Sequence, residues 1–368
     1  MGASETERRP LRAAVIGAGG VGQLRHIPAM REAEQLGLAE LVAICDPSEE
    51  TRRTAGERFG VAERYADYRE LLGRADLDVV TIATPNSSHE VIAIAALEAG
   101  KHVLCEKPLA LTYDGARRME EAARRAGRKT SVNFRYRWVP SARYLKELVE
   151  TGEVGQVHEL FMTYLNAGVH DPNQPIRWRQ TRAEGGGNLR DIGSHLIDLA
   201  HWLVGPVRRV YAQRRTFTPE RPTDGGPERV PVDVDDAATC LLEFASGASG
   251  LMNVSGMALG RVNHQRIELY GSKAGAVYEI DRTGDIGGDT LQVCFGPAQH
   301  RAVGMAPARV LPRHHGTPVS CFLDFLSAIH EGREPSVTFA DAVRVQEVLE
   351  AAESSAERGE WVELPVRR

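Results

Sequence analysis

Residues 13–23 read AAVIGAGGVGQ, a run of small and β-branched apolar residues that passes directly into a group of glycines. Gly17, Gly19 and Gly22 form the pattern G-x-G-x-x-G. Glycines after a buried strand permit a tight turn and a close backbone approach to phosphate, and the start of the next helix favours a negative charge. The pattern alone is weak in a chain with 36 glycines, so its place between strand and helix is what carries weight. The stretch predicts the first strand–turn–helix of a dinucleotide-binding domain.

The sequence around this stretch repeats the same alternation of strand and helix. Four further apolar runs follow, ELVAICD, DVVTIATP, KHVLCEKP and KTSVNFRY, and they are nearly continuous rather than alternating. Such runs are typical of strands buried on both faces of a parallel sheet. Segments of helical period lie between them and end at glycines, which are favoured helix C-caps. We expect a Rossmann domain with a doubly wound parallel sheet over residues 11–132, after a disordered leader over 1–10.

The pattern changes near residue 133. A helical segment, PSARYLKELVETG, leads into longer and mostly alternating runs joined by turns that contain glycine. This is typical of an antiparallel sheet with one face covered by helices. Residues 133–368 are therefore predicted to form an α+β domain with a large, mainly antiparallel open sheet, which binds substrate and forms the oligomer. The last helical segment, FADAVRVQEVLEAAESSAERG, could pack back on the first domain.

Composition excludes several classes of protein. The 45 basic and 50 acidic residues give a formal charge of −5 without a long basic run, which argues against a nucleic-acid partner. No apolar stretch reaches the length of a membrane span. The five cysteines form no C-x-x-C pair, which indicates reduced thiols in a cytoplasmic protein. His314 and His315 are adjacent and lack partners at ligand spacing, so no metal site is predicted.

The end of the second strand bears on the choice of cofactor. Asp46 lies near the spacing expected of the acidic residue that binds the adenosine ribose. Its carboxylate could accept both ribose hydroxyls and would repel a 2′-phosphate, which favours NAD over NADP. Arg52 and Arg53 follow closely and keep NADP open as the alternative. The predicted cofactor contacts of this region are Gly17, Gly19, Gly20, Val21, Gly22 and Asp46.

A second candidate region, CEKP at residues 105–108, ends another of the strands. Ligands of open α/β sheets bind beyond the carboxyl ends of the strands, so Lys107 should face the same edge as the glycine loop and the Thr84–Asn86 turn. Read by itself, the tetrapeptide favours an ordinary surface turn.

A third region, GGGNLRDIGSH at residues 185–195, contains Asp191 and His195. Residues four apart on a helix share a face, and a carboxylate there can orient an imidazole and favour its charged form. On spacing alone, such a pair is more often a helix cap or a surface pair.

Four motifs in order, the glycine loop, ATPNSSH, EKP and GGGNLRDIGSH, resemble the Gfo/Idh/MocA family of NAD(P)-dependent oxidoreductases over nearly the whole chain. The family includes glucose–fructose oxidoreductase and inositol dehydrogenases. The resemblance implies that Lys107 is the active-site lysine, often preceding a cis proline, and that Asp191 and His195 are its catalytic partners. It also implies that the nicotinamide and its ribose are lined by Thr84, Pro85, Asn86, His89 and Glu106.

Substrate contacts are expected from the second domain, although roles in a domain interface or core stay open for each of them. Arg137 begins RWVP, which resembles the family's R-x-x-P, and Asn166 ends a strand. Arg177 and Trp178 lie in PIRWRQ, where the indole offers an apolar wall for a sugar ring. With Lys107, Asp191 and His195 they form the predicted substrate set.

The expected activity is NAD-dependent oxidation of a secondary hydroxyl of a sugar, anhydrosugar or cyclic polyol, by a homotetramer or homodimer. Three alternatives stay open. A lyase or glycosidase could oxidise its sugar transiently with no net NADH, a non-catalytic protein could sense NAD, and a nucleotide-sugar or biliverdin-type reductase would share the fold.

Overall fold

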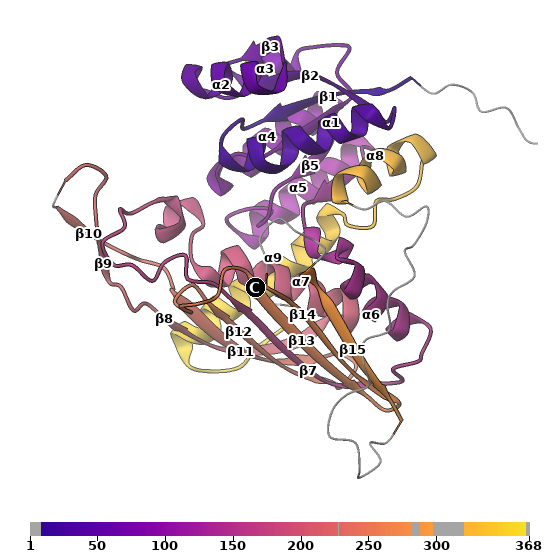
Figure 1. Cartoon of the computed structure of the whole chain (residues 1–368), viewed down its shortest axis with the longest axis vertical. Coiled ribbons are helices and arrows are strands. Elements are labelled where there is room, and N and C mark those ends of the chain that lie inside the picture. The colour runs from indigo at the N-terminus through magenta and orange to yellow at the C-terminus, as the bar shows by residue number, and fades with distance from the viewer. Residues whose placement is uncertain (1–8, 227, 282–287, 297–319, 366–368) are drawn as a thin grey trace, which may run out of the picture. The chain divides into compact units, whose positions relative to one another are not determined.

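The computed structural model describes residues 9–226, 228–281, 288–296 and 320–365. The chain divides into two compact units, one of residues 1–134 with 316–343 and the other of residues 135–315 with 344–368. Figure 1 labels most of their helices and strands. The division differs from the expected one because residues 316–343 join the first unit. Most of the leader expected over 1–10, and the histidines at 314 and 315, lie outside the described residues.

The first unit is built on a six-stranded parallel sheet in the order β3-β2-β1-β4-β5-β6. This is the predicted doubly wound Rossmann topology, and the strand order reverses its direction of growth between β1 and β4. Its strands are β1 (Leu11–Ile16), β2 (Ala39–Cys45), β3 (Glu63–Tyr65), β4 (Val79–Ile82), β5 (His102–Cys105) and β6 (Thr130–Val132). Most residues of β1, β2, β4 and β5 are buried, as their continuous apolar runs predict.

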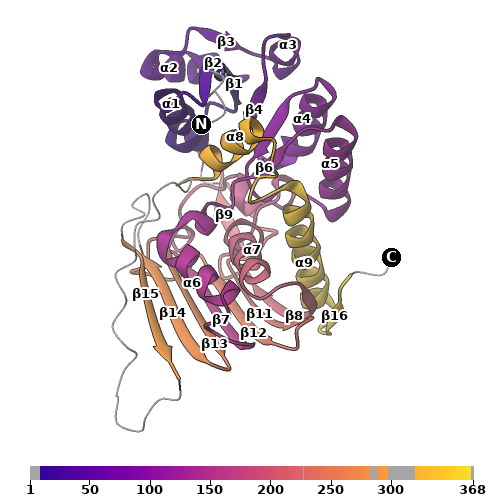
Figure 2. The same cartoon turned by 90° about the vertical axis from the view of Figure 1, so that its right-hand side faces the viewer.

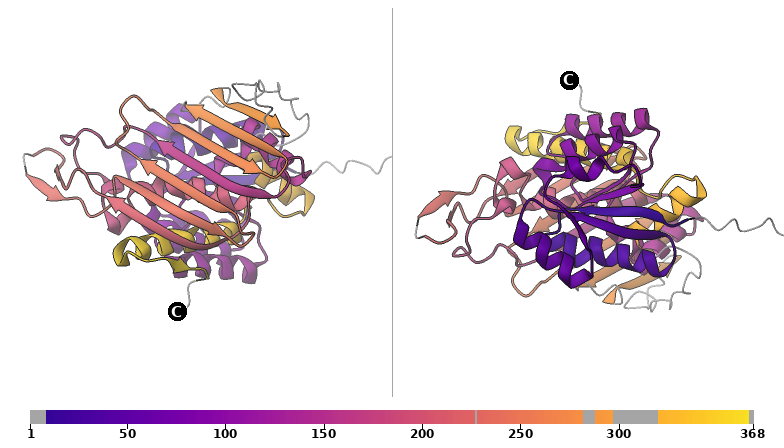
Figure 3. Two further views of the ribbon diagram at one scale, coloured as in Figure 1. Left: turned by 90° about the horizontal axis from the view of Figure 1, so that it is seen from below. Right: turned by 90° about the horizontal axis from the view of Figure 1, so that it is seen from above.

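Helices lie on both faces of this sheet (Figure 3, right). They are η1 (Gly22–His26), α1 (Ile27–Gln35), α2 (Glu49–Phe59), α3 (Tyr68–Leu72), α4 (Asn86–Glu98), α5 (Tyr113–Ala126) and α8 (Cys321–Glu331). Local signals explain their ends: Ser48 caps the start of α2 and Gly60, in the left-handed conformation, ends it. Helix α8 follows the long second-unit segment in the sequence, yet it contacts α1 and β6.

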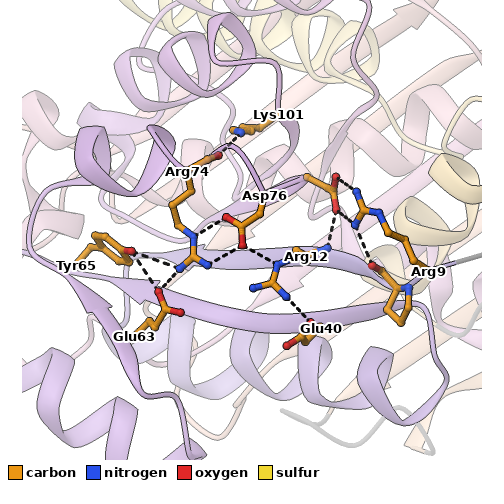
Figure 4. A network of polar contacts seen from close by, with 10 residues as sticks. Arg9, Arg12, Glu40, Glu63, Tyr65, Arg74, Asp76 and Lys101 are labelled. Atoms are coloured by element: carbon orange, nitrogen blue, oxygen red, sulfur yellow. Dashed lines mark hydrogen bonds and ion pairs between the residues drawn. The ribbon is translucent and has the colours of Figure 1, made fainter.

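The amino-terminal edge of the parallel sheet carries a network of ion pairs (Figure 4). Arg12 at the start of β1 contacts Asp76 at 2.9 Å and Glu40 at 2.8 Å. Arg74 pairs with the same Asp76 at 2.9 Å, and its carbonyl accepts a hydrogen bond of 2.7 Å from Lys101 Nζ. These contacts tie the beginnings of several strands together, while the candidate site residues of this unit follow the opposite, carboxyl ends.

The second unit contains an eight-stranded sheet in the order β15-β14-β13-β7-β12-β11-β8-β16. Only the β7–β12 pair is parallel among the strand pairs described in it, so the mainly antiparallel sheet is confirmed. Its strands are β7 (Val157–Leu165), β8 (Val207–Arg215), β11 (Ala237–Phe244), β12 (Ser249–Ser255), β13 (His264–Gly271), β14 (Ala274–Asp281), β15 (Thr290–Phe295) and β16 (Val362–Glu363). A short hairpin of β9 (Glu220–Pro222) and β10 (Arg229–Pro231) stands apart from it.

Helices cover one face of this sheet (Figure 2). The longer helices of this unit are α6 (Pro140–Glu150), α7 (Ser194–Leu203) and the part of α9 (Phe339–Arg358) from Arg344 onward. Its short helical segments are η2 (Arg135–Trp138), η3 (Trp178–Gln180), η4 (Arg182–Glu184) and η5 (Leu189–Gly193). Strand β11 shows the resulting alternation: Cys240 and Leu242 are buried, and Leu241 between them is 43% exposed. Figure 3 (left) looks onto the other face, where the strands lie in front of the helices.

Neither a membrane-spanning helix nor a metal-binding cluster occurs among the described residues. None of the helices there is long and apolar enough to cross a membrane. The same part of the chain holds no cluster of three or more histidine, cysteine, aspartate or glutamate residues that could bind a metal ion.

Candidate functional site

The glycine loop after β1 combines two kinds of glycine. Gly17 has φ +95°, and a Cβ there would lie 2.6 Å from the carbonyl carbon of Ala83, so the turn needs a residue without a side chain. A Cβ at Gly22 would lie 2.0 Å from the Gly17 carbonyl oxygen. At Gly19 and Gly20 a Cβ would meet nothing within 4 Å, which leaves open space beside the start of the helix. This loop, with Val21 in the first helical turn, fits the pyrophosphate of a dinucleotide.

Asp46 follows β2 beside this loop. One carboxylate oxygen accepts a 3.0 Å hydrogen bond from the Ala18 amide, and the other accepts one of 3.0 Å from the Ser48 amide. The guanidinium of Arg52 donates to the backbone carbonyls of Asp46 and Pro47. Arg53 pairs with Glu57 at 3.1 Å. Both arginines that kept NADP open thus have acceptors within the unit, which favours NAD.

The Thr84–Asn86 turn after β4 is held by two residues of α4, Ser88 and the buried His89. Ser88 Oγ donates a 2.8 Å hydrogen bond to Thr84 Oγ1, and Pro85 is the N-cap of α4. Asn86, in the first turn of α4, is 5% exposed.

His89, predicted to lie beside the nicotinamide, is buried in the first unit between two backbone carbonyls. Its side chain is fully buried, with Nδ1 3.0 Å from the Pro108 carbonyl oxygen and Nε2 3.0 Å from the Thr84 carbonyl oxygen. Burial lowers its pKa, although the two carbonyls act in the opposite direction. The ring therefore joins the turn after β4 to the turn after β5, because both of its nitrogens face backbone of the same unit.

Glu106, directly after β5, is held from three sides. One carboxylate oxygen accepts hydrogen bonds of 2.7 Å from Asn133 Nδ2 and 3.1 Å from His26 Nε2, and the other accepts one of 3.2 Å from the Lys107 amide. Burial acts to raise the pKa of Glu106, but the bond from His26 and the nearby charges outweigh it and lower the pKa to about 2. Glu106 is thus an ionised carboxylate that fixes the chain at Lys107, a role that the sequence motif did not reveal.

Lys107 is half-buried, and its peptide bond to Pro108 is cis, as the family resemblance implies. Glu106 binds the amide of the lysine itself, and His89 approaches the carbonyl of the following proline. The backbone on both sides of Lys107 is therefore held by buried side chains, which is the arrangement expected of a preorganised functional group.

In the second unit, Asp191 belongs to η5 and His195 to α7, which continues it. Asp191 accepts a 3.2 Å hydrogen bond from Arg179 Nε, and the Arg179 guanidinium lies 4.2 Å from the centre of the Trp178 ring. His195 is 5% exposed. The helix thus brings one partly exposed carboxylate and one buried imidazole into successive turns.

Two tyrosines beside His195, Tyr136 and Tyr164, were not predicted from the sequence. The Tyr136 ring stands edge-on to the His195 ring at 4.7 Å, and its hydroxyl lies 2.7 Å from the Tyr164 hydroxyl. The Asn263 side-chain amide donates a 3.0 Å hydrogen bond to the same Tyr136 hydroxyl. Burial raises the pKa of Tyr164 well above its ordinary value, so the phenol stays protonated. These residues are far apart in sequence, and no motif marks them.

Arg137, one of the predicted substrate residues, forms a buried ion pair within the second unit. It is 6% exposed and forms hydrogen bonds of 2.9 and 2.5 Å to the two carboxylate oxygens of Asp198. A buried bidentate pair of this kind uses the guanidinium fork inside the unit. Asp198 lies on α7, so the pair joins η2 to α7 within the second unit.

The remaining predicted substrate residues lie on one irregular stretch after β7. Asn166 is half-buried, and its side-chain oxygen accepts a 2.8 Å hydrogen bond from the Gly168 amide. Arg177 is exposed and Trp178 is half-buried at the start of η3. Their contact with substrate stays a prediction.

The comparisons with known proteins agree with the fold and with the motifs. Residues 11–134 match the model of an oxidoreductase family with an NAD-binding Rossmann fold, and residues 142–277 match the GFO/IDH/MocA C-terminal domain. The chain is 36% identical to levoglucosan dehydrogenase of Pseudarthrobacter phenanthrenivorans over 351 residues, which cover 88% of this chain and 89% of that protein. It is 33% identical to myo-inositol 2-dehydrogenase of Thermotoga maritima over 268 residues, 72% of this chain and 73% of that one.

A solved structure of levoglucosan dehydrogenase in complex with NADH and levoglucosan matches with a TM-score of 0.88 at 34% identity, over 97% of this chain and 99% of the other. Both domains of the family are thus represented in the chain. The chain belongs to the Gfo/Idh/MocA family of NAD-binding oxidoreductases.

Proposed function

We propose that this protein is an NAD-dependent dehydrogenase that oxidises a secondary hydroxyl group of a sugar, anhydrosugar or cyclic polyol. The observation that carries the proposal is the held lysine: Lys107 follows β5, fixed through Glu106 and His89, at the sheet edge that also bears the glycine loop and Asp46. A lysine in a merely solvated turn would need neither support. Membership in a family of sugar and polyol dehydrogenases agrees with it.

Each catalytic residue has a role that its chemistry allows. Bound NAD would take up the hydride from the substrate carbon at its nicotinamide ring. His195 accepts the hydroxyl proton as general base, and Asp191 orients the imidazole and favours its charged form. Lys107 donates a hydrogen bond to the same oxygen and stabilises the negative charge that develops there.

For the substrate we infer a compact ring such as a 1,6-anhydropyranose. The relative with 36% identity acts on levoglucosan, and the matched structure contains that sugar. In this chain Trp178, half-buried beneath the Arg179 guanidinium, offers a flat apolar surface of the kind on which a pyranose ring stacks. Arg177 and Asn166 supply polar groups on the same stretch for the ring hydroxyls.

We also propose a homotetramer or homodimer formed through the open face of the eight-stranded sheet. Phe161 on β7 is 37% exposed and Leu241 on β11 is 43% exposed, and the strand register places both on the same face of the sheet. Large apolar side chains that gather on one sheet face favour burial against another subunit.

A cytoplasmic location is proposed from the five cysteines, all of which are free thiols.

The test is an absorbance screen at 340 nm with the purified protein. NAD and NADP are each paired with anhydrosugars, inositols, aldoses and glycosides, and the sugar products are analysed in parallel. Net NADH with an anhydrosugar or polyol supports the dehydrogenase. A cleaved or epimerised sugar without net NADH would replace it with transient oxidation, and intact NAD binding without any turnover would favour an NAD sensor.

A further inference from the structure

Asp235 lies two residues before β11 and is 4% exposed. Its side-chain Oδ2 accepts a 2.8 Å hydrogen bond from the Leu189 amide, and its backbone carbonyl accepts one of 3.1 Å from the Asn188 amide. The first N–H groups of a helix have no partner within the helix. Here two of them, at the start of the segment that carries Asp191 and His195, are bound by a single residue 46 positions further along the chain.

The approach of Asp235 depends on a glycine. Gly187 has φ +101°, and a Cβ there would lie 2.8 Å from Asp235 Oδ1. The Gly187 carbonyl in turn accepts a 2.9 Å hydrogen bond from the Asp191 amide. Asp235 therefore contacts the chain from Gly187 to Leu189, and this short stretch holds the backbone of Asp191.

Burial makes the ionised form of the Asp235 carboxylate energetically unfavourable. Burial raises its pKa to about 6, while the Leu189 amide and Arg214 act to lower it. The Arg214 guanidinium is 3.9 Å away, and it also faces Glu353 at 3.7 Å, which binds Arg190 of η5 through two hydrogen bonds of 2.6 Å. An apolar residue would avoid the desolvation of a charge, so the carboxylate at this position calls for a reason other than packing.

We propose that Asp235 is a positioning residue for the reaction: it fixes the helical segment 188–195 so that Asp191 and His195 keep the orientation that proton transfer requires. Asp235 itself contacts no substrate. The inference rests on the proposed function, because only there do Asp191 and His195 have a chemical task.

The neighbouring Asp236 provides a matched control. It is 2% exposed, and its carboxylate accepts hydrogen bonds of 2.7 and 2.9 Å from the Phe217 and Thr218 amides, in a different loop. The two aspartates thus share burial and bonding, and differ in the segment that they hold.

Amide hydrogen exchange of the full chain tests the positioning without any assay of activity. Asp235→Ala is expected to speed exchange across residues 188–195 by about tenfold, the effect of losing a helix cap. Asp235→Asn, which keeps an acceptor oxygen, should restore most of the protection, and Asp236→Ala should act on residues 217–218 instead. If Asp235→Ala does not fold, Asp235→Ser, whose shorter side chain does not reach Leu189, replaces it. Unchanged exchange at 188–195 would overturn the inference.

Kinetics test its chemical consequence. With a sugar that the wild type oxidises, Asp235→Ala should lower kcat by about tenfold, because small displacements of catalytic groups are costly, while KM for NAD stays within about twofold. Asp235→Asn should recover most of kcat, and Asp236→Ala should leave it within about twofold at an equal loss of thermal stability. An equal fall of kcat in Asp236→Ala would contradict the inference. A wild type that oxidises no sugar contradicts the proposed function alone, and the exchange data then decide the role of Asp235.

Discussion

Glu106 in the first unit and Asp235 in the second are both largely buried carboxylates that hold the backbone of a candidate catalytic segment, yet their pKa values move in opposite directions. The pKa of Glu106 is lowered to about 2, and that of Asp235 is raised to about 6. Burial raises both. The difference lies in the hydrogen-bond donors: Glu106 receives bonds from His26, Asn133 and the Lys107 amide, whereas the Asp235 carboxylate receives one from the Leu189 amide.

The comparison shows that donors, rather than burial, decide whether a buried carboxylate stabilises the folded chain. Because Glu106 stays ionised from acid to alkaline pH, the support of Lys107 is constant under ordinary conditions. The pKa of Asp235 lies closer to neutrality, so the contribution of this group to the stability of the fold is present in acid and is lost as the pH rises through about 6.

The largest expected effect is that of replacing Lys107, whose backbone amide is bound by Glu106. Lys107→Ala should lower kcat for sugar oxidation by at least about a hundredfold, because it removes the group that stabilises the developing negative charge. NADH binding, followed by fluorescence titration, should stay near that of the wild type. The control is Lys129→Ala, a lysine of the same unit that pairs with Glu334. Near-normal turnover of Lys107→Ala would remove the lysine from the mechanism.

Glu106→Gln tests the carboxylate whose ionised form stabilises the folded chain. The pKa of Glu106 in the folded chain lies below the ordinary 4.5, so the ionised group stabilises the fold above about pH 4.5 and this contribution is lost as the pH falls towards 2. The substitution should lower the free energy of unfolding by about 3 kcal/mol at pH 7, and by less at pH 3. Urea unfolding at the two pH values measures this, with Glu334→Gln, an exposed carboxylate, as the control.

Asp235→Asn should show the opposite dependence on pH. The folded pKa of about 6 lies above the ordinary 3.8, so the contribution of this group is largest at low pH and is lost as the pH rises through 6. The variant avoids that loss. Its stability relative to the wild type should therefore rise by about 2 kcal/mol between pH 4 and pH 7.5. A difference that stays constant over this range in thermal unfolding would show that Asp235 does not titrate there.

A third carboxylate, Asp46, extends the comparison to a group with two amide donors beside the glycine loop. Asp46→Asn should raise KM for NAD by about tenfold, equivalent to about 1.4 kcal/mol, and should weaken the preference over NADP because the repulsion of a 2′-phosphate is lost. Initial rates with both cofactors measure this. Asp67→Asn is the control, since Asp67 caps α3 through the Arg69 amide. An unchanged cofactor preference would leave the selectivity unexplained by Asp46.

The fold was predictable because its signals are local. Continuous apolar runs give the strands of the parallel sheet, and serine, threonine and glycine mark the ends of α2 and α5. The short, exposed β3 and the helix α8 were missed: β3 has no apolar period, and α8 is separated in sequence from the unit to which it belongs.

The candidate site was predictable only as far as motifs reach. Lys107 and the glycine loop follow from strand ends and from the family resemblance. The supporting contacts join distant positions: His26 binds Glu106 80 residues away, and Tyr164 bonds to Asn263 99 residues away. Nothing local to His89 shows that both of its nitrogens face carbonyls, so its burial could not be foreseen.

The most direct test of the account follows the hydrogen that the reaction moves. The wild-type protein is incubated with NAD and with levoglucosan that is deuterated at its carbon atoms. The mass of the reduced cofactor is then measured by mass spectrometry. The account predicts NADH that carries one deuterium, since the hydride comes from the carbon that bears the oxidised hydroxyl. A converted sugar without deuterated NADH would contradict net hydride transfer to NAD.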